Sequence, residues 1–226
     1  MNVWQRKDSA QASLAAKVFE DHAAEYDSWF TDSLVYRIER AALRSLNRGM
    51  PGPKMEIGVG PGRFAMDLGV VFGLDPARSP LQLARQRNIT CCQGFGEELP
   101  IKDCVVGTVY LLCTLCFAFN PVKMVAESSR ILHHGGYLVI GMVPARSPWG
   151  KHLAAKKDAG HIFYEHANFY TIEAVSQWLA RANMRVVAHR STLYQNPGET
   201  EYEEPPRDIL DEGAGFVVMA ARRGHV

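Results

Sequence analysis

A glycine-rich segment, EIGVGPG from Glu56 to Gly62, contains the first residues whose types and spacing suggest chemistry. Gly58, Gly60 and Gly62 alternate with other residues at the end of the predicted strand KMEIGV. Glycine lets a backbone turn tightly and approach a ligand without a Cβ in the way. A strand that passes through such a loop into a helix commonly binds a nucleotide. We therefore expect a nucleotide-containing ligand at this loop.

An acidic residue, Asp75, closes the next apolar run, VVFGLD. Its carboxylate can accept charge-assisted hydrogen bonds from both hydroxyls of a ribose. A dinucleotide fold also uses an acid, and Gly60, Gly62 and Ala65 satisfy its glycine pattern, but its acid stands about 20 residues further on. Asp75 follows Gly62 by only thirteen residues, which disfavours NAD(P). Local capping of the turn at Pro76 is the other interpretation.

The elements that must position these residues alternate between strand-like and helix-like segments, as in a parallel, doubly wound sheet. Helices are predicted over residues 1–30, 32–46, 64–68, 79–86, 122–132 and 171–182. Strands are predicted over residues 54–59, 70–75, 89–94, 107–112, 137–143, 184–194 and 215–221. We predict that HHGG (133–136) is a turn and that the histidine-rich stretch 147–166 is a loop.

Composition excludes several classes of protein. The 226 residues are 47% apolar and 22% charged, as in an ordinary globular protein rather than a disordered or fibrous one. No apolar run approaches the roughly 20 residues of a membrane-spanning helix, so we expect no membrane insertion. A net charge of +1 with mixed signs argues against a nucleic-acid partner. The N-terminus lacks an apolar signal core, and we therefore expect a cytoplasmic protein.

Five cysteines form an odd set, and two of them, Cys113 and Cys116, make a C-x-x-C pair. Such a pair can be a redox site or half of a zinc site. It ends an apolar run, and neither a second pair nor two histidines at ligand spacing completes four zinc ligands. We therefore expect reduced, buried thiols and no metal.

Four segments in order resemble class I S-adenosylmethionine-dependent methyltransferases of the type 11 family, which includes the ubiquinone and menaquinone biosynthesis enzymes. They are EIGVGPGRFA, GLDPARSPLQLAR, GEELPIKD and NPVKMVAESSRILHHGGYLVIG. The resemblance covers most of the chain. It implies that Gly58, Gly60 and Gly62 pass under the methionine end of the donor, while Asp75, followed by Pro76, holds its ribose.

The same resemblance assigns further residues to the donor site. Glu56 would brace the glycine loop, and Gly96 and Glu97 would border the adenine. Cys113 and Thr114, at the end of the fourth strand, would offer their backbone carbonyls to the methionyl amino group. The expected product is S-adenosylhomocysteine.

The resemblance also implies the fold. We expect one α/β domain over residues 1–226, with a Rossmann-like, mostly parallel seven-stranded sheet, an antiparallel last strand and helices on both faces. Residues 1–48 would form a helical lid, 49–145 the donor-binding core, and 146–226 the acceptor-side segment and the final strands.

The lid and two departures from the family bear on the donor site. HAAEYDSWF (22–30) resembles the family's N-terminal helix, so Tyr26 is the candidate lid residue, although its ring could equally pack on the sheet. Phe95 stands where the family often has an acid, and Val106 and Gly107 stand where it has a Phe-Asp pair. These departures put adenine recognition in doubt.

The acceptor side offers weak candidates for catalysis: His161, Tyr164 and His166. Histidine can accept a proton near neutral pH, although a histidine on an exposed loop is usually only solvated. We predict methyl transfer to a small-molecule acceptor by in-line displacement. The alternatives are a non-catalytic S-adenosylmethionine-binding regulatory protein and, less favoured, an NAD(P)-dependent oxidoreductase.

Overall fold

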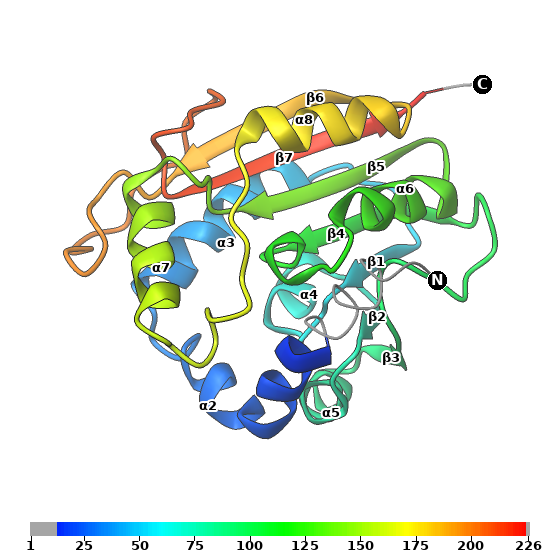
Figure 1. The fold of residues 1–226 in the computed structure, drawn as a ribbon. Coiled ribbons are helices and arrows are strands. Elements are labelled where there is room, and N and C mark those ends of the chain that lie inside the picture. The colour runs from blue at the N-terminus through cyan, green and yellow to red at the C-terminus, as the bar shows by residue number, and fades with distance from the viewer. Residues whose placement is uncertain (1–12, 225–226) are drawn as a thin grey trace.

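The computed structural model describes residues 13–224. Its strands are β1 (Lys54–Ile57), β2 (Phe72–Asp75), β3 (Thr90–Gln93), β4 (Val106–Leu112), β5 (Leu132–Met142), β6 (Met184–Thr192) and β7 (Phe216–Arg223). They form one seven-stranded sheet of order β3-β2-β1-β4-β5-β7-β6 (Figure 1). β1 to β5 pair in parallel, and β7, the last strand of the chain, runs antiparallel to both neighbours. The predicted fold class is confirmed.

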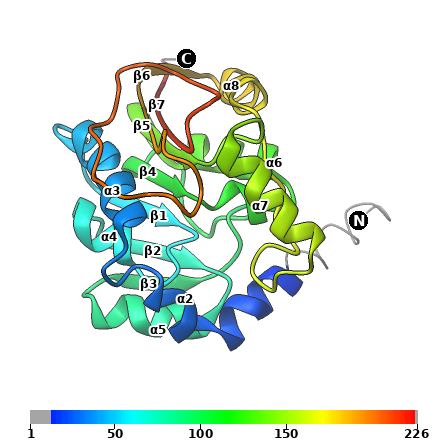
Figure 2. The same ribbon diagram turned by 90° about the vertical axis from the view of Figure 1, so that its left-hand side faces the viewer.

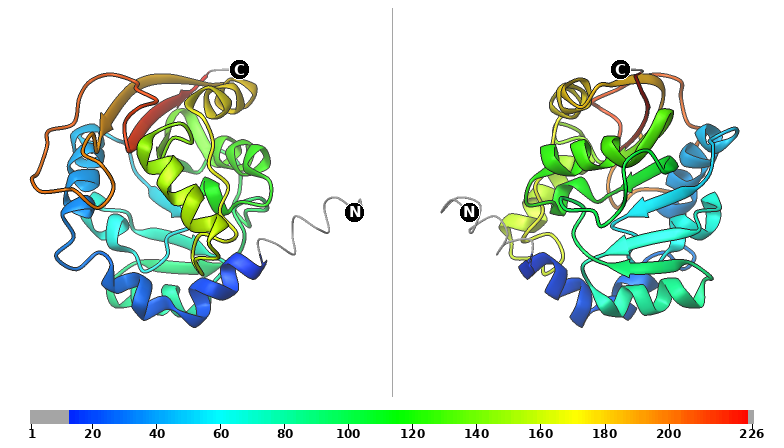
Figure 3. Two further views of the ribbon diagram at one scale, coloured as in Figure 1. Left: turned by 60° about the vertical axis from the view of Figure 1, so that its left-hand side comes forward. Right: turned by 90° about the vertical axis from the view of Figure 1, so that its right-hand side faces the viewer.

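Helices cover both faces of this sheet. They are α2 (Ala23–Ser28), α3 (Leu34–Asn47), α4 (Arg63–Leu68), α5 (Arg78–Gln86), α6 (Pro121–Ile131), α7 (Pro148–Asp158) and α8 (Ile172–Arg181), with a 3₁₀ turn η1 (Leu115–Phe117). α3 and α4 lie on one face, and α6 and α8 lie on the other (Figure 2). α2, α7 and the helical residues 13–21 lie beyond the carboxyl ends of the parallel strands (Figure 3). These helices therefore cover the edge of the sheet, whereas α3, α4, α6 and α8 cover its faces.

The central strand β4 shows why two helical layers are needed. Every residue of β4 is buried. Val109 and Leu111 pack in the core under α6 and α8, whereas Tyr110 and Leu112 pack in the core under α3 and α4. Successive side chains of a strand point to opposite faces, so a continuous apolar run requires cover on both sides.

Two local predictions are wrong. HHGG is not a separate turn: β5 begins at Leu132, which pairs with Val106, and regular pairing resumes at Tyr137 with Thr108 after an irregularity. The stretch 147–166 is not all loop, because α7 occupies much of it. This helix buries only Gly150 completely and therefore has no apolar stripe to reveal it. Its sequence signal was local: Ser147 caps the first turn and Pro148 follows it.

Residues 1–12 of the predicted lid and residues 225–226 lie outside the described residues. Between residues 13 and 224, no helix combines the length and the apolar character needed to cross a bilayer.

The core makes a direct prediction about stability. Phe216, on β7, is fully buried against Gly141 of β5, where even an added Cβ would meet its ring. We expect Phe216→Ala to lower the free energy of unfolding by about 3–5 kcal/mol, since it leaves a cavity that the sheet cannot collapse to fill. Urea denaturation measures this. Val187→Ala, on the exposed face of β6, is the control with an expected loss under about 1 kcal/mol, and equal losses would contradict the prediction.

Candidate donor and acceptor cavities

The site lies where the strand order reverses. β1 leads outward to β2 and β3, whereas its other neighbour β4 leads outward to β5. Connections leave the two strands in opposite directions, which opens a crevice at their carboxyl ends. Gly58 directly follows β1 and Cys113 directly follows β4, so both turns border this crevice. A first cavity of about 110 Å³ lies there.

The glycine loop is held tightly against the neighbouring strands. The backbone N–H groups of Gly58 and Val59 both donate to the carbonyl of Leu74 on β2, at 2.7 and 3.0 Å. Gly58 has a φ of +72°, and a Cβ there would clash with the side chain of Thr114. Glycine is therefore required at this position by both conformation and space.

Gly62 has a different role from Gly58 and Gly60. Gly58 and Gly60 line the first cavity, whereas Gly62 does not. Its φ of +80° starts α4, and a Cβ would clash with Ile89 and press on Ala84 of α5. Gly62 thus allows the close packing of the loop on α5, as expected for the last glycine of such a loop.

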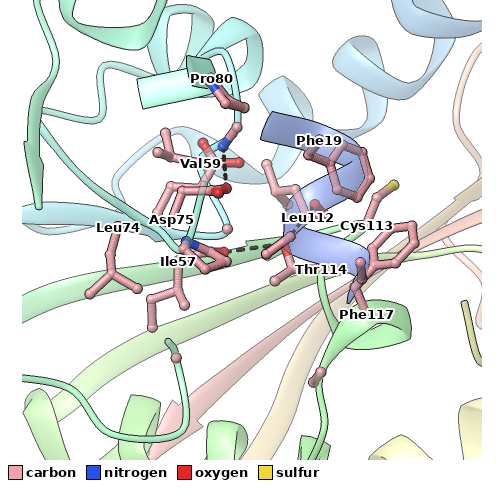
Figure 4. Close-up of a pocket in the computed structure, with 18 of the residues that line it drawn as sticks. Phe19, Ile57, Val59, Leu74, Asp75, Pro80, Leu112, Cys113, Thr114 and Phe117 are labelled. Atoms are coloured by element: carbon pink, nitrogen blue, oxygen red, sulfur yellow. Dashed lines mark hydrogen bonds between the residues drawn. The ribbon is translucent and has the colours of Figure 1, made fainter. Parts of the chain in front are cut away.

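Asp75 braces the glycine loop from β2 (Figure 4). One carboxylate oxygen accepts from the N–H of Gly60 at 2.9 Å, and the other accepts from the N–H of Ala77 at 2.9 Å. The turn-capping bond of the local interpretation is therefore present. Burial raises the pKa of Asp75 to about 6, against the effect of these two bonds. A carboxylate has about four acceptor positions, so two remain for a ligand in the cavity that Asp75 lines.

A second buried carboxylate, Glu56, faces the same cavity from β1. Its side chain is only 2% exposed, and Oε2 has no hydrogen-bond partner among the described residues. Burial, with the nearby Asp75 charge, raises the pKa of Glu56 well above its ordinary value. A buried polar atom without a partner is costly. The position therefore favours a ligand that brings a hydrogen-bond donor or a cation.

The segment after β3 also lines the first cavity, through Phe95, Gly96 and Glu97. Glu97 accepts hydrogen bonds from the backbone N–H groups of Phe119 and Asn120 at 3.0 and 3.3 Å, so it anchors the segment after β4. Phe95 is 37% exposed and offers an aromatic edge in place of the family's acid. Phenylalanine at this position makes this part of the wall of the first cavity apolar and does not close the cavity.

The other departure lies away from the site. Gly107 lines neither cavity, and a Cβ there would clash with the backbone carbonyls of Pro51 and Gly52. Its N–H donates to the carbonyl of Pro53. Glycine at 107 is thus explained by the close approach of the segment before β1.

A second cavity of about 250 Å³ adjoins the first at the end of β4. The two share the side chains of Phe19, Tyr26 and Phe117, together with Cys113 and Thr114. Phe19 and Phe117 approach each other across Cys113 (Figure 4), with ring centroids 5.0 Å apart. About half of the residues that line the second cavity are aromatic. The two cavities thus adjoin, the first lined by carboxylates and glycines and the second largely by aromatic rings.

Comparisons with known proteins match this arrangement. A family described as a methyltransferase domain matches residues 55–140. An uncharacterised protein of Mycobacterium tuberculosis is 42% identical over 203 residues, which cover 88% of this chain and 71% of that protein. An uncharacterised protein of Methanocaldococcus jannaschii is 33% identical over 208 residues, which cover 91% of this chain and 98% of that protein.

A solved structure carries the comparison further. The S-adenosylmethionine-dependent methyltransferase of Thermotoga maritima, a possible histamine N-methyltransferase, is 31% identical, with a TM-score of 0.85 and coverage of 92% of this chain and 99% of that chain. The chain belongs to the class I S-adenosylmethionine-dependent methyltransferase family. Geranyl diphosphate C-methyltransferase of Streptomyces coelicolor, solved with S-adenosylhomocysteine, shares the fold at 15% identity, with a TM-score of 0.62 and coverage of 87% and 84%.

Of the three residues predicted on the acceptor side, the fold brings only one to a cavity. Tyr164 lines the second cavity, whereas His161 and His166 line neither. The His161 ring packs 4.9 Å from the Tyr164 ring, and its Nδ1 is buried without a partner among the described residues. Burial raises the pKa of Tyr164 far above its ordinary value, so its phenol is neutral near pH 7.

One residue of the second cavity, Glu39, is absent from the sequence predictions. It lies on α3 one turn after Val35, on the face that points into the cavity. A signal was available, because Val35, Glu39 and Ala42 follow a helical spacing that places a carboxylate among apolar side chains.

The described part of the predicted lid is joined to the rest of the domain by ion pairs. The Asp27 carboxylate on α2 accepts hydrogen bonds from Arg63 Nε at 2.7 Å and from Arg87 Nη2 at 2.8 Å. Arg87 also donates to the carbonyl of Pro61 in the glycine loop, at 2.7 Å. Glu20 accepts from Ser79 at the start of α5. These bonds hold residues 13–30 across the crevice, where Tyr26 lines both cavities.

The Asp27 bonds predict a pH-dependent stability. Burial raises the pKa of Asp27, but hydrogen bonds from Arg63 and Arg87 outweigh it, and the pKa lies below its ordinary value. Asp27→Ala should lower the free energy of unfolding by about 2 kcal/mol at pH 7, since charge-assisted bonds are lost. A depressed pKa contributes stability above the unfolded value of about 4, and this stability disappears as the pH falls through the folded value.

Urea denaturation at pH 7, 5 and 3 tests this, and the gap between the wild type and Asp27→Ala should close at the lowest pH. Asp21→Ala is the matched control, because Asp21 is 49% exposed and pairs only with the exposed Lys17 on the same helix. Its expected effect is below about 0.5 kcal/mol. An Asp27 effect as small as that of Asp21 would contradict the prediction.

Proposed function

We propose that this protein transfers a methyl group from S-adenosylmethionine to a small-molecule acceptor. The observation that carries the proposal is the junction of two cavities at Cys113 and Thr114. On one side a glycine loop and Asp75 suit an adenosyl group, and on the other an aromatic cavity offers room for an acceptor. A protein that only bound the donor would have no need of the second cavity.

The first cavity fits the donor in its polar groups. Asp75 has free acceptor positions for the two ribose hydroxyls, and Pro76 follows it along the cavity wall. Glu56 supplies a partnerless buried oxygen that suits the methionyl ammonium, together with the backbone carbonyls of Cys113 and Thr114. We assign the donor's methionine end to Gly58 and Gly60.

The remaining lining residues complete the donor site. Gly96 and Glu97, with Phe95, would border the adenine, because all three line the first cavity and the family resemblance assigns this segment to the adenine. Tyr26 would cover the methionine end as part of the lid, residues 1–48, of which 13–48 are described. Residues 49–145 would form the donor core, and residues 146–226 would contribute the acceptor side through Tyr164.

When bound, S-adenosylmethionine supplies a methyl group on a cationic sulfur, which is already activated for displacement. The chain's own residues then have two tasks. They must hold the acceptor atom in line with that methyl group, at about 3–3.5 Å. They must also keep water away, and the aromatic rings around the junction serve this purpose.

The assignment of Asp75 gives a binding prediction. Asp75→Ala should weaken the binding of S-adenosylhomocysteine by about 1–3 kcal/mol, since hydrogen bonds to a carboxylate are lost and the glycine loop loses its brace. Isothermal titration calorimetry measures the change. Asp208→Ala is the control, because that carboxylate is 73% exposed and lines neither cavity, and this variant should bind S-adenosylhomocysteine normally. An unchanged affinity in Asp75→Ala would remove Asp75 from the site.

Turnover is tested with radiolabelled S-adenosylmethionine and a panel of amines, phenols, thiols and carboxylic acids. Transfer of label to any member supports an enzyme. Tight binding of S-adenosylhomocysteine without transfer across the panel would instead support a regulatory binding protein. Stronger thermal stabilisation by NADH than by S-adenosylhomocysteine would overturn the donor assignment.

A further inference from the structure

Glu39 is the only charged residue that lines the second cavity within the described part of the chain. It lies on α3, and Ser33, Val35 and Tyr36 of the same region line the cavity beside it. No hydrogen bond or ion pair joins its carboxylate to another residue in the described range 13–224. The helix thus presents a single acidic group, without a counter-ion, to a chamber walled by rings.

The groups around Glu39 are neutral at physiological pH. The other titratable side chains that line this cavity belong to six residues: Tyr26, Tyr36, Cys113, Cys116, Tyr164 and Tyr170. Burial raises the pKa of each of them, that of Cys116 to about 12. Arg40, the next residue of α3, points elsewhere, toward Asp67 and the ring of Tyr36. No cation among residues 13–224 therefore balances Glu39.

The chemistry of this chamber selects among ligands. An anionic ligand would find no cation among the residues that line this apolar cavity and would be disfavoured. A divalent metal ion needs several oxygen ligands, whereas a single carboxylate lies here. A cation with apolar substituents fits on both counts: the carboxylate neutralises its charge, and the faces of Trp29, Trp149 and Tyr164 attract it through their π systems.

The position of Glu39 relates this preference to the reaction. Glu39 lines the second cavity together with Cys113 and Tyr26, and both of these residues also line the donor cavity. A group paired with Glu39 therefore occupies the cavity that adjoins the donor, on the acceptor side.

We propose that the acceptor is a small aromatic or aliphatic amine that binds as its ammonium ion, with Glu39 as its counter-ion and the surrounding rings as its apolar walls. This inference rests on the proposed function, since it names the class of molecule that occupies the second cavity. Glu39 is assigned a role in recognising the acceptor, independent of donor binding.

The pairing predicts how binding depends on pH. In the free protein, burial raises the pKa of Glu39 to about 8. A simple alkylammonium has a pKa near that of lysine, about 10.4, and stays charged through this range. Ionised Glu39 becomes more abundant as the pH rises toward 8, so affinity for an ammonium should increase between pH 6 and 8, by up to about tenfold per unit. At pH 6, where Glu39 is protonated before binding, each complex that forms releases about one proton from its carboxyl group.

The test measures the binding of benzylamine, 2-phenylethylamine and 4-phenylbutylamine, each against its matched alcohol, by calorimetry with S-adenosylhomocysteine present. At pH 8, at least one amine should bind the wild type tenfold more tightly than its alcohol, and affinity should fall toward pH 6. Glu39→Gln should abolish both the preference and the pH dependence, while Glu39→Asp should retain part of each.

Glu203→Gln is the matched control, because Glu203 pairs with Arg37 of the same helix but is 62% exposed and lines neither cavity. It should bind amines as the wild type does. S-adenosylhomocysteine affinity should be unchanged in Glu39→Gln, which also shows that the variant is folded.

The outcomes separate the two proposals. Failure of the wild type to bind S-adenosylhomocysteine overturns the proposed function. Normal binding of S-adenosylhomocysteine, with no amine preferred over its alcohol at pH 8, overturns the amine proposal alone. An amine preference that persists in Glu39→Gln also overturns it, since the cation would then be recognised by other groups.

Discussion

The site depends on the close approach of two backbone turns, the one after β1 at Gly58 and the one after β4 at Thr114. These strands are neighbours in the sheet, and their connections leave in opposite directions, so a crevice opens between the turns. The Thr114 hydroxyl lies within hydrogen-bonding distance of the carbonyls of Leu112 and Ile57, at 3.0 and 3.2 Å, and a Cβ on Gly58 would clash with this same side chain. Glycine at position 58 therefore allows the two turns to approach closely.

Around this junction the protein buries carboxylates rather than balancing them. Glu56 and Asp75 face the first cavity and Glu39 faces the second, and burial raises the pKa of all three. Unpaired buried charge is unfavourable in the free protein. A ligand that brings a hydroxyl or ammonium group to such a carboxylate removes that penalty. The burial that lowers the stability of the free protein would therefore strengthen the binding of such a ligand. At the edge of the crevice, by contrast, a carboxylate is balanced: Arg63 and Arg87 form ion pairs with Asp27 and thereby hold α2 in place.

Much of the fold and of the donor site follows from the sequence alone, because the causes are local. The alternation of short apolar runs with helical spacing determines a doubly wound sheet, and a strand that is apolar at every position, such as β4, must be covered on both faces. Gly58 and Asp75 are recognisable because a tight loop and the end of the next strand always meet at the same edge of a parallel sheet. These relations require only the order of the elements along the chain.

The acceptor side was decided by tertiary structure. Tyr164 is far from Tyr26 and Glu39 in the sequence, and only the packing of α2, α3 and the segment after α7 around one edge brings the three residues to a single cavity. α7 escaped prediction because it buries almost none of its surface and so carries no apolar stripe. His161 and His166 were plausible by residue type, but residue type does not say which way a side chain points. Local pattern determines secondary structure and strand order, whereas a cavity between non-consecutive elements depends on distances that exist only once the chain is folded.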